Sequence, residues 1–232
     1  MFVIIGLFVI IGLGIYFSLS SKRKENELLE TVTDSYRGTS TERNLVLKLL
    51  KYGIPAENIF HDLYVEKSNG NFSQIDLVVI TEVGIIVFEV KDYSGWLFGK
   101  GNQDKWTQVL AYGKIKHRFY NPVMQNNGHI TALKKQLPQF EELPFYSVIV
   151  FYGNCRLRDV SFIPQGTYIA YPERVIDVIK TIMDKNKSVS YSDKSEIIRV
   201  LKEAVQKGEN KEIQNKHIRN VRDMLGKDRI FE

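Results

Sequence analysis

The chain opens with a continuous apolar stretch, residues 2–19, that contains no charged side chain. A helix of about 20 mostly apolar residues is long enough to cross the roughly 30 Å hydrocarbon layer of a bilayer. A cleaved signal peptide is disfavoured because the basic residues Lys22, Arg23 and Lys24 follow the stretch instead of preceding it. A buried core helix is disfavoured because the apolar run is uninterrupted. The pattern predicts a retained single-pass anchor in the cell membrane over residues 1–21, with the rest of the chain in the cytoplasm.

After a charged and polar segment at residues 22–36, helical and strand periodicities alternate along the chain. The strands predicted are residues 59–65, 74–80, 85–91, 146–152 and 167–171, and the helices predicted are residues 41–51, 105–116, 122–137, 172–184 and 193–207. Residues 93–104 are expected to be irregular. This order predicts an α/β fold in which a mixed central sheet is flanked by helices.

Two of these strands, residues 74–80 and 85–91, flank a short turn and carry charged residues at their far ends. If the turn centres between Glu82 and Val83, Asp76 lies directly opposite Glu89 on the same face of the hairpin. Directly opposed residues place their Cβ atoms about 4.5–5.5 Å apart, so two carboxylates there repel each other. A divalent cation such as Mg²⁺ or Mn²⁺ compensates that repulsion, because carboxylate oxygens are the ligands that these ions prefer.

Lys91 lies two residues beyond Glu89 on the same face, where its ammonium can reach a metal-bound water or a phosphate oxygen. The alternative is an ordinary ion pair at the end of a strand, between Lys91 and one of the two acids. The apolar character of both strands favours the first interpretation, because it places the charges at the rim of a core.

Glu42 is a third candidate acid, and it also has two interpretations. In the segment Thr39-Ser40-Thr41-Glu42 it matches a capping box, in which the glutamate bonds back to the first residue of the helix. It also shares one helical stripe with the apolar residues at positions 45, 46 and 49, so it points toward the core, where a carboxylate needs a partner.

Composition narrows the choice of function only slightly. The apolar fraction of 44% excludes wholesale disorder, and the single cysteine, Cys155, excludes an internal disulfide. The net charge of +5 permits a polyanionic partner without requiring one.

His129 is interpreted as structural rather than as a metal ligand. One basic cluster beside aromatic residues is either a solvated face or a contact for a phosphate backbone; it comprises Lys114, Lys116, His117 and Arg118, with Tyr112, Phe119 and Tyr120.

Four blocks of sequence, taken in order, resemble the NERD (nuclease-related domain) family of the PD-(D/E)XK nuclease-like superfamily. They are GTSTERNLVLKLL, QIDLVVI, GIIVFEVKDYSG and NPVMQNNGHI, within a similarity that covers residues 36–151. In that superfamily an acid opens one central strand and E-x-K ends the next, which corresponds to Asp76 and to Glu89-Val90-Lys91. The helical glutamate corresponds to Glu42. One departure is Thr41, which stands where the family often has glycine; Gly38 is the nearest glycine.

The resemblance implies a restriction-endonuclease-like fold with an α-β-β-β-α-β core, and hydrolysis of nucleic-acid phosphodiester bonds, with DNA the favoured substrate. It implies that Asp76, Glu89 and Glu42, with the Val90 carbonyl, hold Mg²⁺ or Mn²⁺, and that Lys91 positions or activates the attacking water. Gln125, after Asn-Pro, corresponds to a family glutamine and is a candidate for phosphate or water contact; a plain polar position at a helix start is the alternative.

The domain organisation that follows is an anchor at residues 1–21, a juxtamembrane linker at 22–36, a nuclease-like domain at 37–155 and a C-terminal strand and helical extension at 156–232. The first competing hypothesis is a catalytically silent module that keeps the nuclease fold and serves for nucleic-acid binding or as a scaffold. A second is an assembly protein that uses the anchor to organise partners at the membrane. The sequence points to no particular protein partner.

Overall fold

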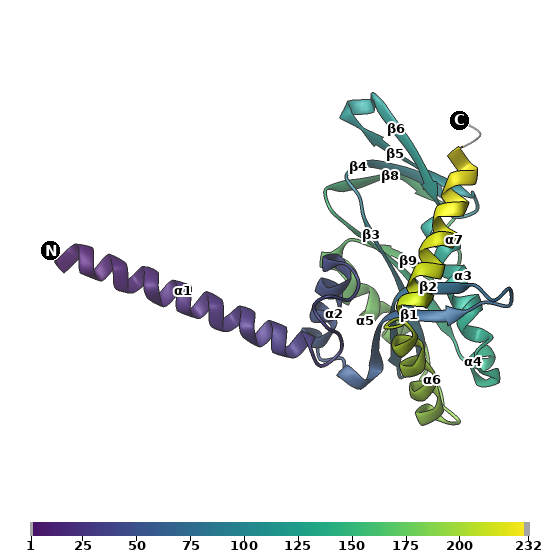
Figure 1. Ribbon diagram of the computed structural model, residues 1–232, viewed down its shortest axis with the longest axis horizontal. Helices are drawn as coiled ribbons and strands as arrows, with labels where there is room; N and C mark the ends of the chain where they lie inside the picture. Colours follow the sequence, from purple (N-terminus) through teal and green to yellow (C-terminus); the bar gives the residue numbers. More distant parts are fainter. Residues whose placement is uncertain (1, 230–232) are drawn as a thin grey trace.

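A computed structural model describes the backbone of residues 2–229 and the side chains of residues 16–222. Its centre is a five-stranded mixed sheet in the order β1-β2-β3-β7-β9 (Figure 1). The first three strands are antiparallel neighbours, whereas β7 and β9 run parallel to β3. The strands are β1 (Ile59–Glu66), β2 (Phe72–Thr81), β3 (Gly84–Asp92), β7 (Phe145–Tyr152) and β9 (Thr167–Ala170). The five predicted strands are therefore confirmed.

Helices cover both faces of this sheet, because each face is apolar and must be shielded from water. On one face α2 (Ser40–Tyr52) and α5 (Val175–Lys185) pack against the sheet. On the other face lie α3 (Pro122–Lys134), α4 (Pro138–Glu142) and α6 (Lys194–Lys207). The order α2-β1-β2-β3-α3-β7 is the expected α-β-β-β-α-β arrangement.

A second sheet continues from the first, in the order β6-β5-β4-β8. Its strands β4 (Gly95–Lys100) and β8 (Cys155–Ser161) pair in parallel, as do β3 and β7, which precede them in the chain. The strands β5 (Lys105–Leu110) and β6 (Ile115–Tyr120) form an antiparallel hairpin that projects from the molecule (Figure 1).

This second sheet corrects two predictions. Residues 105–116 are not a helix but β5, a 3₁₀ turn η2 (Ala111–Gly113) and the start of β6, and the region 93–104 contains β4. The apolar residues Trp106, Val109 and Leu110 have the i, i+3, i+4 spacing of a helix, but Trp106 and Val109 also favour strands. Backbone pairing of β5 with β4 and β6 decides between the two, and that pairing is not visible in local sequence.

Two long helices lie at the ends of the chain, and two further 3₁₀ helices, η1 (Ala56–Asn58) and η3 (Pro172–Arg174), complete the elements. The first, α1 (Phe2–Leu29), extends away from the body, and α7 (Lys211–Arg229) runs beside β2 (Figure 1). Within the described residues, no helix is both long and apolar enough to span a bilayer. The predicted anchor at residues 1–21 falls mostly on positions whose side chains lie outside the described residues.

Candidate active site

The β2–β3 hairpin has the predicted register along most of its length. Val78 pairs with Val87 and Ile80 with Ile85, across a turn at Glu82. The ladder ends at the pair Leu77 and Phe88, one position before Asp76. On its other side, the pairing of β2 with β1 skips Asp76 as well. Asp76 therefore lies where the ladders on both sides of β2 are interrupted.

This interruption changes how Asp76 meets β3. Ile75 packs in the same core cluster as Val78, whereas Leu77 packs in the opposite one, so the regular alternation of faces breaks at Asp76. Its Oδ2 atom accepts a hydrogen bond of 2.7 Å from the backbone N–H of Val90. The predicted direct pairing of Asp76 with Glu89 is therefore wrong. Instead, the Asp76 carboxylate accepts the hydrogen bond from Val90 that a backbone carbonyl would accept in a regular pair of strands.

A distorted residue on β1 accompanies the break. Asp62, which would oppose Asp76, has a left-handed backbone with φ of 55°. Arg37 holds it in place: Nη2 of Arg37 donates 2.8 Å to the Asp62 carbonyl oxygen, and the guanidinium also pairs with the Asp62 carboxylate at 3.3 Å. Gln74 Nε2 donates to the remaining oxygen of that carboxylate at 2.9 Å.

Glu89 is the most buried acid of the site, with 1% of its surface exposed. Its Oε1 atom lies 2.5 Å from Nζ of Lys91, and its Oε2 atom lies 3.1 Å from Nε2 of His129 on α3. The other ring nitrogen of His129 lies 2.7 Å from the hydroxyl of Ser73 on β2. An ionised carboxylate can only accept, so Nε2 of His129 donates to Glu89.

Glu42 repeats this arrangement on the other face of the sheet. Its Oε2 atom lies 3.3 Å from Nε2 of His61 on β1, and Nδ1 of His61 lies 2.7 Å from the hydroxyl of Thr33. Thr39 caps helix α2, and its hydroxyl lies 2.7 Å from Glu42 Oε1. Glu42 therefore takes part in the cap and is also buried on the core-facing stripe of α2, while its role at a metal site stays a prediction.

Gly38 lies against Glu42, and its position requires a glycine, although position 41 is threonine. Its φ is +57°, and a Cβ atom at this position would lie 2.4 Å from Glu42 Oε2 and 2.6 Å from His61 Nε2. Only a residue without a side chain fits between the two partners.

The electrostatics couple these groups. Burial, followed by the charges of Glu89 and Glu42, raises the pKa of Asp76 well above its ordinary value. Burial also acts to raise the pKa of Glu89, but Lys91 and His129 outweigh it and the net pKa is lowered. For Lys91, burial acts to lower the pKa, and the charges of Glu89 and Asp76 raise it overall. The pKa of Glu42 falls below its ordinary value because hydrogen bonds from His61 and Thr39 exceed the effect of burial.

Two further predicted residues lie beside this group. Val90 supplies the N–H that bonds Asp76 and is itself buried on β3. Gln125 is half-buried on α3, one helical turn before His129 and on the same side of the helix. The structure therefore gathers Asp76, Glu89 and Lys91 at the open end of the hairpin, with Gln125 one turn away from a histidine that contacts Glu89.

Comparison with known families identifies the chain. Its residues 37–152, half of its length, match the nuclease-related domain, NERD. The chain belongs to the NERD family. This family is of the general PD-(D/E)XK nuclease-like kind. The chain is also 28% identical over 159 residues to an uncharacterized protein of Bacillus anthracis, covering 68% of this chain and 73% of the relative. No solved structure matches it.

The donor set of this NERD domain suits a hard divalent cation. Asp76 and Glu89 offer carboxylate oxygens, and the pKa of Asp76 is raised first by burial and then by the charges of Glu89 and Glu42, both of which a bound cation would offset. Within the described residues, no three His, Cys, Asp or Glu side chains are grouped closely enough to hold a metal. Mg²⁺ does not require three, because it is usually bound through one or two carboxylates and keeps several waters.

Two of the histidines of this NERD domain, His61 and His129, contact the candidate acids. His129 was predicted to be structural, which stays a prediction, and the partner that it contacts is Glu89, a candidate ligand. His61, which does the same for Glu42, was missed. One available signal was the spacing of Gln125 and His129, which places both on one side of a helix. For His61 no local signal exists, because its partners come from distant segments.

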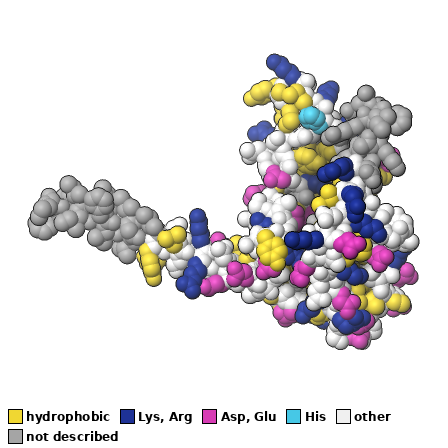
Figure 2. All heavy atoms as spheres, in the orientation of Figure 1, with side chains coloured by type: hydrophobic (Ala, Val, Ile, Leu, Met, Phe, Trp, Pro, Cys, Tyr) yellow, Lys and Arg dark blue, Asp and Glu magenta, His cyan; other side chains and the backbone are white. Residues whose placement is uncertain are grey.

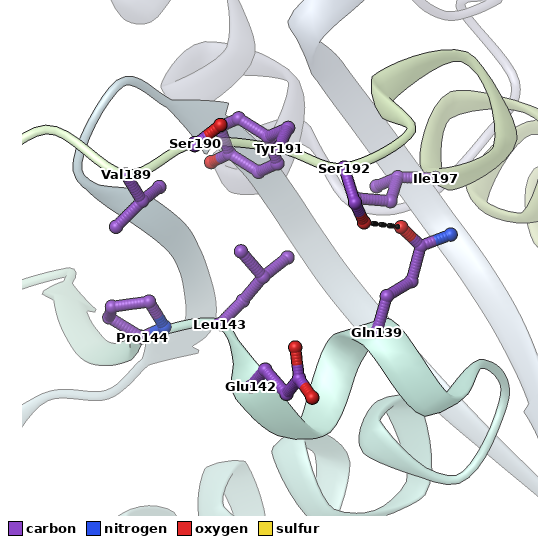
Figure 3. A pocket seen from close by; sticks show the side chains of 9 residues that line it. All are labelled: Gln139, Glu142, Leu143, Pro144, Val189, Ser190, Tyr191, Ser192 and Ile197. Atoms are coloured by element: carbon purple, nitrogen blue, oxygen red, sulfur yellow. Dashed lines mark hydrogen bonds between the residues drawn. The ribbon is translucent and has the colours of Figure 1, made fainter.

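A pocket of about 160 Å³ lies elsewhere on the NERD fold, at the turn end of the β2–β3 hairpin. Figure 3 shows its lining from α4, the following loop and the segment before α6, with Ser192 donating to Gln139 at 3.0 Å. Tyr191, which lines it, bonds to the carbonyl of Thr81 at the turn. Asp76 and Glu89 lie at the opposite end of these strands, so the pocket is separate from the candidate site.

Proposed function

We propose that this chain is a membrane-anchored, divalent-metal-dependent nuclease that hydrolyses nucleic-acid phosphodiester bonds, with DNA the first substrate to test. The observation that carries the proposal is the convergence of Asp76, Glu89 and Lys91 at one end of the hairpin. Burying two carboxylates near each other is unfavourable unless a cation is present to compensate them. Membership of a nuclease-related family supports the same reaction.

In this proposal Asp76 and Glu89, with the Val90 carbonyl, hold Mg²⁺ or Mn²⁺, and Glu42 contributes charge from the other side. The ion would polarise the scissile phosphate and make a bound water more acidic. The raised pKa of Lys91 keeps its side chain an ammonium at neutral pH, so it orients the water and stabilises negative charge on the phosphate oxygens rather than removing a proton. Gln125 contacts the phosphate or the water.

A second candidate function is a catalytically silent nucleic-acid-binding or scaffold module that retains the nuclease fold. One observation favours it: both carboxylate oxygens of Glu89 are already engaged, by Lys91 and by His129. A metal would have to share these oxygens with Lys91 and His129 or displace one of the two. In the silent module these contacts are permanent and stabilise the fold.

A cleavage assay with the 232-residue chain in mild detergent separates the two candidates. Single- and double-stranded DNA and RNA are incubated with Mg²⁺, Mn²⁺ or EDTA, using wild type, Asp76→Asn and Lys91→Met. The matched control is Asp159→Asn, which removes an exposed acid. We expect metal-dependent cleavage that falls at least about 100-fold in both site variants and stays unchanged in the control. Cleavage that survives in Asp76→Asn contradicts the proposal, and binding without cleavage in all proteins supports the silent module.

The membrane location is part of the same proposal. Residues 1–21 act as the anchor, 22–36 as the linker, 37–155 as the nuclease domain, and 156–232 as an extension. The basic cluster at residues 22–24 supports an orientation with the domain in the cytoplasm. A reporter fused to the C-terminus tests this orientation, and reporter activity outside the cytoplasm would refute it.

A further inference from the structure

The hairpin of β5 and β6 with its connecting turn, residues 105–120, forms a projecting element that we name the β5–β6 arm. Strand β6 is the edge of its sheet and pairs with β5 alone. Five of its six side chains are exposed, and only Phe119 is half-buried. Figure 1 shows the arm at the end of the molecule away from α6. Only Phe119 of β6 packs against the core, so the exposed side chains of this strand need another explanation.

The charge of the arm is strongly one-sided. Its 16 residues include four Lys or Arg and no Asp or Glu, which gives +4, against +5 for the whole chain. Lys116 and Arg118 alternate along β6 and therefore share a face, with Tyr120 next in the row. Within the described residues, Lys114, Lys116 and Arg118 pair with no carboxylate. An ordinary solvated strand interleaves both signs of charge, so this arm is suited to a polyanion.

Aromatic rings accompany these charges on the surface. Tyr112 at the tip is 97% exposed, and its φ of 54° is a left-handed conformation that a bulky residue rarely adopts. Tyr120 is also exposed, at 54%. Figure 2 shows basic and apolar side chains gathered over the projecting end of the arm. Exposed rings beside cations are the combination that binds nucleic-acid strands, through phosphates and base faces.

The root of the arm lies at the candidate active site. The chain enters the second sheet through Tyr93, two residues after Lys91, and the Tyr93 ring packs on Phe119 of the arm at 4.5 Å between centroids. It leaves the arm at Asn121, which starts the helix α3 that carries Gln125 and His129. The segments on both sides of the arm thus carry residues of the candidate site.

The root is also firmly held. Trp106 is fully buried and stacks on Phe151 at 5.9 Å, and its indole N–H donates to the Lys100 carbonyl. The side-chain amide of Asn121 donates to the carbonyl of Lys100 at the end of β4 and to the carbonyls of Gly101 and Gln103 in the loop that follows. Charges on the arm are therefore held at a set position relative to Asp76 and Glu89.

We propose that the β5–β6 arm binds the phosphate backbone of a nucleic-acid strand through Lys114, Lys116 and Arg118, and holds that strand beside the candidate active site. The inference deepens the proposed function, because it names the surface that recognises the polyanion. It does not depend on cleavage, since a silent module of the same family fold would use the arm in the same way.

The test is binding without catalysis. A fluorescently labelled oligonucleotide, single-stranded or duplex, is titrated with the 232-residue chain in mild detergent and EDTA, and anisotropy is read at several salt concentrations. The arm variant is Lys116→Thr with Arg118→Thr, which keeps strand-forming residues on an exposed edge. The matched control is Lys194→Gln with Lys202→Gln, two exposed lysines on α6 that lie far from the arm. Both double variants remove two positive charges.

We expect the arm variant to bind about tenfold more weakly at low salt, and its slope of log affinity against log salt to fall by about one to two. The control should bind like wild type. Equal weakening in both variants overturns the proposal, because net charge alone would then explain binding. It is also overturned if oligonucleotide binding is unchanged while the arm variant loses co-flotation with phosphatidylserine vesicles, since the arm would then bind lipid.

Failure of this proposal is distinguishable from failure of the nuclease proposal. If the protein binds the oligonucleotide through the arm but does not cleave nucleic acid, the proposal for the arm is supported and the nuclease proposal is contradicted. If metal-dependent cleavage is lost in Asp76→Asn while the arm variant binds normally, the nuclease proposal stands and the arm does not. Circular dichroism of each variant checks that the fold is intact.

Discussion

At the scale of single residues, Asp76 is the acid of the candidate site whose ionised form is most disfavoured by its surroundings. Burial and the charges of Glu89 and Glu42 raise its pKa, so the ionised form is disfavoured in the folded protein. Asparagine has the same shape and can still accept the hydrogen bond from Val90 through its carbonyl oxygen. We expect Asp76→Asn to stabilise the metal-free protein by about 1 kcal/mol, a rise in Tm of roughly 2–4 °C. Thermal unfolding in EDTA measures this, and a clear loss of stability would contradict it.

The raised pKa of Asp76 also predicts that the stability of the folded protein depends on pH. The pKa of Asp76 is higher in the folded protein than its ordinary value of 3.8. At pH values between this ordinary pKa and the pKa in the folded protein, the folded state therefore binds more protons than the unfolded state. Stability contributed by this group is therefore lost as pH rises through that window. In EDTA, the Tm advantage of Asp76→Asn over wild type should grow as pH rises from about 4 toward neutral. An advantage that shrinks over this range would show that Asp76 is not destabilised by ionisation.

Gly38 illustrates a residue whose role is to leave space. Gly38→Ala would place a methyl group against Glu42 and His61 on a backbone with positive φ, and we expect a loss of about 2–3 kcal/mol. Gly53→Ala is the control, because Gly53 also has positive φ but no atom lies within 4 Å of an added Cβ. Its cost should be about 1 kcal/mol, from backbone strain alone. Equal losses in urea unfolding would mean that the contacts of Gly38 do not matter.

At the scale of elements, the β5–β6 arm divides into a buried root and an exposed tip. We expect Trp106→Ala to cost about 3–5 kcal/mol, because the indole is fully buried between two sheets. Tyr112→Ala at the tip should leave Tm unchanged, since its ring has almost no contacts. Thermal unfolding of both variants tests this division. A large effect at Tyr112 would mean that the tip packs against the protein.

Elements also differ in how readily their sequence reveals them. Strands β2 and β3 are apolar, β-branched and separated by a two-residue turn, so local pattern predicts both the strands and their register as far as Leu77. Local pattern predicts the β5–β6 arm wrongly, because its apolar residues are spaced like those of a helix. The strand that pairs with β5 on its inner side, β4, is also not recognisable from local sequence. Helix α7 is polar over much of its length, and it falls within the predicted C-terminal extension without having been predicted as a separate helix.

At the scale of the whole molecule, one side chain joins the beginning of the domain to its end. Arg37 is buried, pairs with Asp62 on β1 and donates to the Val205 carbonyl on α6 at 2.9 Å. Arg37→Leu would leave the Asp62 carboxylate buried without its cation, and we expect a loss of about 3–5 kcal/mol. Arg199→Leu is the control: Arg199 pairs with Glu196 and Glu203, but on the surface, so Tm should hardly change. Similar Tm losses in the two variants would argue against the buried link.

The extension after residue 155 belongs to this larger unit. Strand β9 adds to the parallel edge of the main sheet, α5 covers one face, and α6 covers part of the other. The apolar stripes of these helices are readable in sequence, but the face that each one covers depends on strand order. Strand order is set by contacts between residues distant in the chain, and periodicity carries no information about them.

The amino-acid sequence by itself determined the strands of the main sheet, the hairpin register as far as Leu77 and the candidate acids Asp76, Glu89 and Glu42, because these follow from local periodicity and from motifs of a few residues. Only the tertiary structure decided what each acid contacts. The bond of Asp76 to Val90, the histidines that hold Glu89 and Glu42, and the second sheet with its basic arm all join segments far apart in sequence. Their physical reason is packing and backbone pairing across the fold, which no local pattern encodes.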